Sequence, residues 1–232
     1  MGKTSFALNI LMRAALQGKK IVSIFSLEMG SEQIVDRILA LVSGTSMHKI
    51  TRGALDEDDF AHLGEAMEKL SSCQLFIDDK GAVSLPELRS KLRRLKIEKG
   101  GLDLVVIDYL QLMSSGAGNQ RAGNRVQEIS EISRGLKEIA RELKVPVLAL
   151  SQLNRSLESR PDKRPQLSDL RDSGAIEQDA DTVLMLYRED YYDPYTEKKG
   201  LANVFVRKNR NGPTGDVELK WMKENMEFFD LA

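Results

Sequence analysis

The chain has 232 residues, of which 41% are hydrophobic and 30% are charged, so it is long enough to bury the core of one α/β domain. Its 34 basic and 35 acidic residues give a formal net charge of -1, which excludes a global positive field for nucleic-acid binding and leaves only a local patch. One cysteine excludes an intrachain disulfide, no Cys–His spacing resembles a zinc site, and no apolar run approaches the roughly eighteen residues of a membrane span. We therefore expect one cytoplasmic domain over residues 1–232 without membrane contact.

The first predicted element is a helix that opens directly after Gly2 and Lys3. Apolar residues recur at helical spacing from Thr4 to Gln17, and Gly18 stands where a C-cap glycine is expected.

Short apolar runs typical of buried strands then alternate with amphipathic helical stretches. The strands are expected over residues 21–27, 75–77, 104–107, 145–150 and 182–186. The helices are expected over residues 31–42, 56–70, 85–98 and 125–143. This alternation predicts parallel βαβ units in a doubly wound sheet.

The C-terminal part differs, because residues 203–208 and 216–223 alternate in polarity and are joined by a turn-rich segment. We expect an antiparallel hairpin added to the edge of the sheet, with a further short strand over residues 226–231. Residues 114–123 and 156–165 are expected to be long loops, which inside a compact domain are usually functional or disordered.

The first four residues match the last four positions of the phosphate loop G-x-x-x-x-G-K-[ST], whose first Gly and the three residues after it are missing here. In such a loop backbone amides surround phosphates, the lysine reaches the β and γ groups, and the hydroxyl binds magnesium. Gly2, Lys3 and Thr4 are therefore candidate ligands of ATP and Mg²⁺. Because Gly-Lys-Thr also begins ordinary surface helices, the rest of the chain has to decide.

Two predicted strands end in a carboxylate. Asp108 follows the strand over 104–107, at the sheet edge where open α/β sheets bind ligands, and is a candidate for holding magnesium. A helix-capping or turn role is the alternative. Glu28 follows the strand over 21–27 and is expected beside Asp108, where it can orient an attacking water. Alternatively, Glu28 caps the helix that starts at Ser31.

Three further groups of polar residues are candidates. Gln152 follows the strand over 145–150, and its amide can donate to a phosphate oxygen and accept from water; an exposed loop glutamine is the alternative. Lys208 and Arg210 alternate at a strand end and are expected on one face, either reaching a neighbour's nucleotide or merely solvated. Backbone amides near Gly174, together with Arg171, suit a DNA phosphate at the start of a helix.

In this order the blocks resemble the C-terminal ATPase domain of DnaB-type replicative helicases, over essentially the whole chain. The residues that carry the resemblance are Gly2-Lys3-Thr4, Ser26-Leu27-Glu28-Met29, the run from Val106 to Leu112, the run from Ser151 to Arg155, the run from Leu170 to Asp181, and the run from Lys208 to Gly212. The resemblance implies a RecA-like P-loop NTPase core, a mostly parallel sheet flanked by helices, with a C-terminal antiparallel hairpin.

The resemblance also implies functional roles. Lys3 and Thr4 would bind phosphates and Mg²⁺, Glu28 would be the catalytic glutamate, and Asp108 the magnesium-binding aspartate. Gln152 would link the nucleotide state to a DNA-facing loop.

Two sets of residues would act outside the chain's own nucleotide site. The resemblance implies that Lys208 and Arg210 reach the γ-phosphate held by the adjacent subunit. It implies that Arg171, Asp172 and Gly174 contact single-stranded DNA. The partners expected on this basis are a homo-hexamer, primase and a helicase loader, in the cytoplasm at the bacterial nucleoid.

The sequence departs from the family pattern at its N-terminus. The front half of the phosphate loop and the strand before it are absent, as are the family's N-terminal helical domain and linker, so we expect a chain cut within the loop. Two alternatives to a motor stay open. One is a recombinase of the RecA or RadA type, which shares the fold. The other is a non-catalytic module that does not bind ATP.

Overall fold

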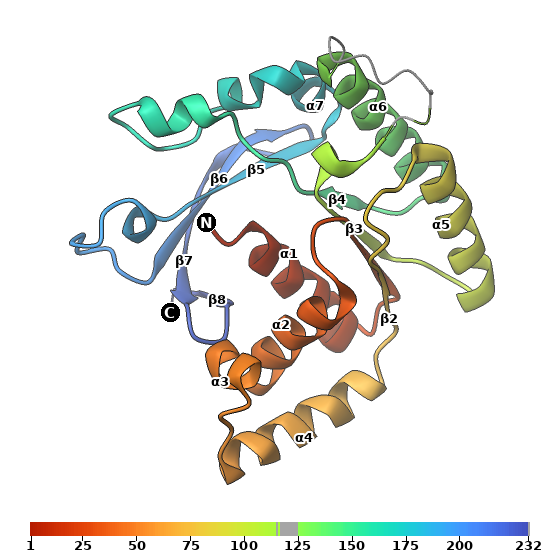
Figure 1. Cartoon of the computed structure of the whole chain (residues 1–232). Helices are drawn as coiled ribbons and strands as arrows, with labels where there is room; N and C mark the ends of the chain where they lie inside the picture. Colours follow the sequence, from red (N-terminus) through yellow and green to blue (C-terminus); the bar gives the residue numbers. More distant parts are fainter. Residues whose placement is uncertain (115, 117–124, 232) are drawn as a thin grey trace.

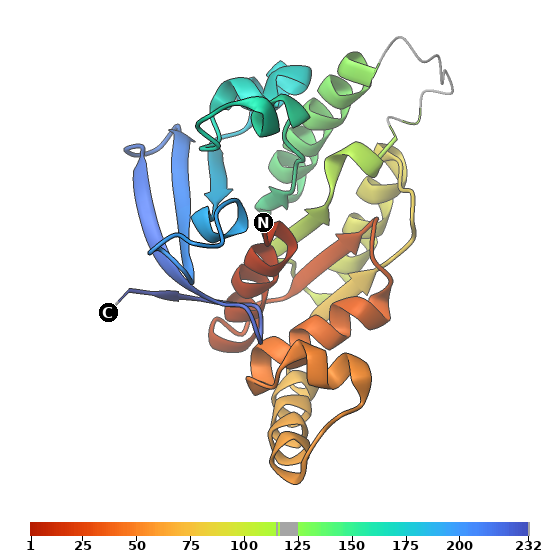
Figure 2. The ribbon, with the colours of Figure 1, turned by 60° about the vertical axis from the view of Figure 1, so that its left-hand side comes forward.

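The protein is described from a computed structural model, which covers residues 1–114, 116 and 125–231. Two four-stranded sheets enclose helix α1 (Lys3–Met12), as Figures 1 and 2 show from two directions. One face of α1 packs Leu8 and Leu11 against the first sheet, and Phe6 packs against the second. A helix covered on both faces positions its N-terminus firmly, and the candidate phosphate-binding residues lie at that end.

The first sheet is parallel, with strand order β2-β1-β3-β4. Its strands are β1 (Val22–Ser26), β2 (Leu75–Asp78), β3 (Leu104–Asp108) and β4 (Val147–Ala149). The connecting helices are α2 (Ser31–Ser43), α3 (Met47–Arg52), α4 (Glu57–Ser71), α5 (Leu85–Lys99) and α6 (Arg125–Leu143). The predicted βαβ alternation is confirmed over these elements.

Helices cover both faces of the parallel sheet (Figure 1). Val105 and Ile107 of β3 belong to the core cluster with α5 and α6, whereas Val106 between them belongs to the cluster with α1 and α2. This alternation is the side-chain period of a strand, and burying each such side chain contributes about 1.5–3 kcal/mol. The two cores hold the carboxyl ends of the strands in fixed register.

The second sheet is antiparallel, with strand order β5-β6-β7-β8. Its strands are β5 (Thr182–Tyr187), β6 (Leu201–Asn209), β7 (Gly215–Met222) and β8 (Glu227–Asp230). The hairpin and the short last strand are confirmed, but two expectations were wrong. First, β5 belongs to this sheet and not to the parallel one. Second, the hairpin extends this second sheet and not the edge of the parallel sheet. The sequence of β5 is almost uniformly apolar, but its burial alternates along the strand, and Leu184 is 41% exposed.

A cavity of about 1130 Å³ separates the two sheets. In the described chain β4 pairs only with β3, and β5 pairs only with β6, so each has one strand edge without a partner strand. Residues of both strands line the cavity, together with Met1, Lys3 and Phe6 at the start of the chain.

The first helix and one of the two expected loops differ in detail from the expectation. After Met12 the chain continues as a π-helical turn, Arg13–Gln17, and ends at Gly18 with φ -81°. Glycine is needed at position 18 because a Cβ would lie 2.7 Å from the carbonyl oxygen of Ala14, not because of a left-handed backbone. Part of the 156–165 loop forms a 3-10 turn, Arg155–Ser159. The 114–123 loop lies outside the described residues except for 114 and 116.

Further short helical elements lie between the strands from β3 onward. They are the 3-10 turns Leu110–Leu112, Leu167–Ser173 and Glu189–Tyr191, and the short helix α7 (Gly174–Asp179). None of the described helices has the length and apolar character needed to span a bilayer.

Candidate functional site

The candidate site begins at the turn before α1. Gly2 is the N-cap of the helix and has φ 92°, a left-handed conformation that favours glycine. Its carbonyl oxygen accepts the first helical hydrogen bond from the amide of Phe6, at 2.9 Å. The backbone therefore turns sharply and points the free amides of the first helical turn out of the helix end, which suits an anion.

Thr4 and Asp108 meet at this helix end. Thr4 Oγ1 donates a hydrogen bond of 2.6 Å to Asp108 Oδ2, and the Asp108 residue is only 4% exposed. Asp108 ends β3 in register with Ser26 of β1. A buried carboxylate and a hydroxyl thus share the carboxyl edge of the sheet, as expected from the sequence.

Lys3 lies among the ends of three strands. Its Nζ donates to the carbonyl oxygen of Ser151, just after β4, at 3.1 Å. Burial lowers the pKa of Lys3 from its ordinary value, while the negative charges of Asp108 and Glu28 act to raise it. The lysine is therefore a partly desolvated cation that faces two carboxylates and gains from an added phosphate.

Glu28 is exposed just after β1, on the side of the sheet edge where its charge acts on Lys3. The alternative role as a cap of α2 is not what the structure has. The cap residue is Gly30, and the amide of Ser31 donates to Asp79 Oδ2 at 2.7 Å. The carboxylate of Glu28 is therefore not occupied by capping α2.

The side chains at this edge of the sheet carry oxygen atoms, which are the ligands that hard cations prefer. Among the described residues, no group of three or more His, Cys, Asp or Glu could hold a metal ion by itself. The Thr4 hydroxyl and the Asp108 carboxylate are oxygen ligands, and magnesium is commonly held by one or two protein oxygens together with waters and substrate phosphates. The residues present therefore fit Mg²⁺ bound with a nucleotide.

Lys208 and Arg210 lie elsewhere, at the C-terminal end of α7. Lys208 Nζ donates to the carbonyl oxygens of Glu177 (2.5 Å) and Gln178 (3.1 Å), and Arg210 Nη2 donates to that of Gln178 at 2.6 Å. The expected common face is present, but the two cations bind helix carbonyls instead of standing free. In the described chain neither of them contacts the cluster around Lys3.

The residues expected to contact DNA lie at the other end of α7. Gly174 begins that helix, as the sequence indicates. Arg171 and Asp172 belong to the 3-10 turn before it, and their side chains lie outside what the structure describes. The short helix α7 therefore separates the predicted DNA-contacting residues from the two cations.

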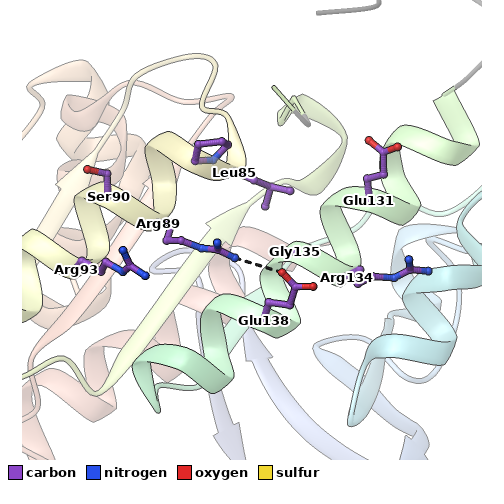
Figure 3. Close-up of a pocket in the computed structure, with 9 residues that line it drawn as sticks. Leu85, Arg89, Ser90, Arg93, Glu131, Arg134, Gly135 and Glu138 are labelled. Carbon is purple, nitrogen blue, oxygen red and sulfur yellow. Dashed lines mark hydrogen bonds and ion pairs between the residues drawn. The ribbon is translucent and has the colours of Figure 1, made fainter. Parts of the chain in front are cut away.

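A second cavity, of about 490 Å³, lies between α5 and α6 (Figure 3). Two of its arginines face carboxylates, since Arg89 Nη2 donates to Glu138 at 3.3 Å and Arg93 pairs with Glu142 at 2.5 Å. None of its lining residues belongs to the candidate site. Lys3, Ser151 and Gln152 border the larger cavity instead.

The comparison with protein families decides what this arrangement belongs to. The family described as DnaB-like helicase C terminal domain matches residues 1–230. The chain belongs to this family. The resemblance drawn from the motif order is thereby confirmed.

Named helicases are similar along the whole chain. The replicative DNA helicase DnaC of Bacillus subtilis (strain 168) is 50% identical over 231 residues, covering 100% of this chain and 50% of the relative. The replicative DNA helicase DnaB of Geobacillus stearothermophilus is 48% identical over 231 residues, with the same coverage. The chain thus spans about half the length of the curated relatives it matches.

Solved structures agree with the DnaB-like assignment. One solved ATPase domain is 41% identical with a TM-score of 0.92, covering 100% of this chain and 81% of that one. A DnaB-like replicative helicase, described with its interactions with primase, is 41% identical with a TM-score of 0.93, covering 100% and 55%. The RadB recombinase, at 20% identity and a TM-score of 0.53, shares the RecA-like fold alone.

The sequence did not point to Gln111, which lies near the site of this DnaB-like domain. Its side chain is hydrogen-bonded to the backbone of Gln152, which is exposed, as expected of a residue beyond β4. Gln111 stands three residues after Asp108, inside a run that resembles the family. That position was the signal available, although no chemistry was assigned to it.

Proposed function

We propose that this chain is the ATP-hydrolysing motor domain of a hexameric replicative DNA helicase, which moves along single-stranded DNA and unwinds duplex at the fork. The observation that carries the proposal is the hydrogen bond of 2.6 Å between Thr4 and Asp108, with Lys3 beside it. Membership of the DnaB-like family and the similarity to named replicative helicases support it. Bacterial replicative relatives also support a working place at the nucleoid.

In this proposal each residue of the cluster has one task. Lys3 and the amides after Gly2 bind the β- and γ-phosphates, and Thr4 and Asp108 hold Mg²⁺. The magnesium ion supplies positive charge that neutralises the phosphates. Glu28, whose charge acts on Lys3, orients the attacking water.

Beyond the cluster, Gln152 responds to the γ-phosphate. Lys208 and Arg210 act on the nucleotide of the adjacent subunit, where a cation given in trans stabilises the developing charge. The backbone around Gly174, with Arg171 and Asp172, contacts phosphates of single-stranded DNA. Primase is a proposed partner because a similar helicase is described with its primase interactions. A helicase loader is proposed from the family resemblance.

The test is unwinding of a forked duplex by a chimaera in which the N-terminal half of the Bacillus subtilis relative precedes Gly2 of this chain. We expect ATP-dependent unwinding without strand exchange, and no unwinding by the Lys3→Ala variant. Strand exchange by the chimaera would instead indicate a recombinase. A chimaera that neither binds nor hydrolyses ATP would indicate the non-catalytic module.

A further inference from the structure

Beyond the end of the parallel sheet, the backbone around Gln152 is held by a side chain. The ladder between β3 and β4 ends at Ile107 and Ala149, and two more bonds follow: Leu150 N to Ile107 O at 2.9 Å, and Leu110 N to Leu150 O at 3.0 Å. After Leu150 the described backbones of the two strands no longer pair with each other. The next two residues, Ser151 and Gln152, are instead contacted by side chains.

Gln111 provides the missing partner. Its Nε2 donates to the carbonyl oxygen of Gln152 at 3.2 Å, and its Oε1 accepts from the amide of Gln152 at 3.3 Å. The same Nε2 donates to Ser151 Oγ at 3.0 Å. A carboxamide that meets both the N–H and the C=O of one residue replaces a main-chain partner, and it fixes the peptide planes on either side of that residue.

Gln111 is itself firmly placed. It lies in the 3-10 turn Leu110–Leu112, between Leu110 and Met113, which are 3% and 2% exposed. Its carbonyl oxygen accepts a hydrogen bond from Arg125 at the start of α6. The turn starts two residues after Asp108, so the magnesium-binding strand end and the end of β4 are joined through one amide.

The Gln111 contact matters because Lys3 makes a hydrogen bond to the same strand end. Lys3 Nζ now donates to the carbonyl oxygen of Ser151, so it also holds the end of β4. If Lys3 binds the β- and γ-phosphates as proposed, its ammonium would be drawn away from that carbonyl. The Gln111 amide then remains as the contact that keeps Gln152 oriented during hydrolysis.

We propose that Gln111 is a positioning residue for ATP hydrolysis, which acts through Gln152 by holding the Ser151 hydroxyl and the Gln152 backbone against the end of β3. The inference rests on the proposed function. It names a residue outside the phosphate loop and the carboxylates, and its effect is on the catalytic rate and not on ATP binding.

The first experiment uses the 232-residue chain and does not depend on activity. Amide hydrogen exchange at Gln152 is measured by NMR in the chain and in Gln111→Met, which keeps a long unbranched side chain but lacks the amide. We expect faster exchange at Gln152 in the variant, and unchanged exchange in Gln33→Met, at an exposed position on α2. Equal protection in the chain and in Gln111→Met would overturn the proposal.

The second experiment uses the chimaera and steady-state kinetics. Gln111→Met should lower kcat for ATP by about 10²-fold, the cost of a misplaced group near the chemistry, and leave KM nearly unchanged. Gln33→Met should change neither constant. A raised KM with unchanged kcat, or no change at all, would contradict the positioning role.

A double variant tests the route of the effect. If Gln111 acts through Gln152, the variant with Gln111→Met and Gln152→Ala should have the kcat of Gln152→Ala alone. Losses that multiply would show that the two residues act independently, and the inference would fail while the proposed function stands. Absence of hydrolysis in the unsubstituted chimaera would overturn the proposed function itself, whatever the exchange at Gln152.

Discussion

Thr4 Oγ1 donates to Asp108 Oδ2 at 2.6 Å, although the two residues are 104 positions apart in the chain. The contact joins the first turn of α1 to the end of β3, and both elements are held by buried side chains on either side of the sheet. The position of the pair is therefore set by packed helix and strand elements and not by the conformation of a loop. Its geometry suits the proposed role of the pair, which is to hold a hard cation shared with a phosphate.

The division of labour between two acidic residues can be tested in the chimaera. Glu28→Gln should retain ATP binding and lose hydrolysis by about 10²- to 10⁴-fold, because the amide keeps the shape but not the carboxylate that orients water. Asp79→Asn is the matched control, since Asp79 receives the Ser31 amide. It should lower the thermal midpoint and leave turnover unchanged. Normal turnover with reduced stability in Glu28→Gln would show that Glu28 is structural.

The two cations at the end of α7 predict a defect between subunits. Arg210→Ala in ring-forming chimaera should lower hydrolysis by about 10³- to 10⁵-fold, and Lys208→Ala less, because an ammonium lacks the planar fork of a guanidinium. Rings that mix Arg210→Ala with Lys3→Ala subunits should recover some activity, wherever an intact loop faces an intact cation. Nearly unchanged ATPase activity in both single variants would mean that the cations only cap α7.

The N-terminal side of the cavity between the sheets predicts a gain in affinity. A short extension, taken from the residues that stand before the matched region in the Bacillus subtilis relative, is joined before Gly2. It should tighten nucleotide binding, because it adds backbone amides to the phosphate loop. It should also raise the thermal midpoint, because Met1 borders the cavity where β4 and β5 have unpaired edges. Equal affinities in a calorimetric titration would show that the added residues contribute little.

The junction between α1 and β8 predicts a loss of stability. Asn9 is 5% exposed, accepts from the amide of Phe228 and donates to the carbonyl of Met226, both at 3.0 Å. Asn9→Leu should cost about 1–3 kcal/mol for each buried group left without a partner. Urea unfolding measures the loss, and Asn211→Ala, at an exposed position of the hairpin turn, is the control. A stability equal to that of the control would contradict this account of the junction.

The sequence predicted the elements whose periodicity is strong. Helix α6 has the expected bounds, Arg125–Leu143, because its apolar residues recur along one face. β5 was assigned to the wrong sheet because a uniformly apolar run does not say which strand will pair with it. The strand that pairs with β5 is β6, which comes later in the chain, and the local sequence of β5 does not encode that pairing.

The same distinction holds in the candidate site. Gly2, Lys3, Thr4 and Asp108 could be named from the sequence because motif order and strand ends determine where they meet. The contact of Asp79 with the start of α2 and the contact of Gln111 with Ser151 could not be predicted from the sequence. Both are hydrogen bonds made by a side chain across 40 or more positions. The helix carbonyls that receive Lys208 were hidden for the same reason, 31 positions away.

The most direct test of the central claim is calorimetric titration of the chimaera with a non-hydrolysable ATP analogue, in the presence and absence of Mg²⁺. The account predicts that Mg²⁺ tightens binding to the unsubstituted chimaera. It predicts that Asp108→Asn removes about tenfold or more of that gain, the worth of a lost charged contact, while affinity without Mg²⁺ stays the same. An equal gain from Mg²⁺ in both proteins would contradict the assignment of Thr4 and Asp108 as the nucleotide–magnesium site.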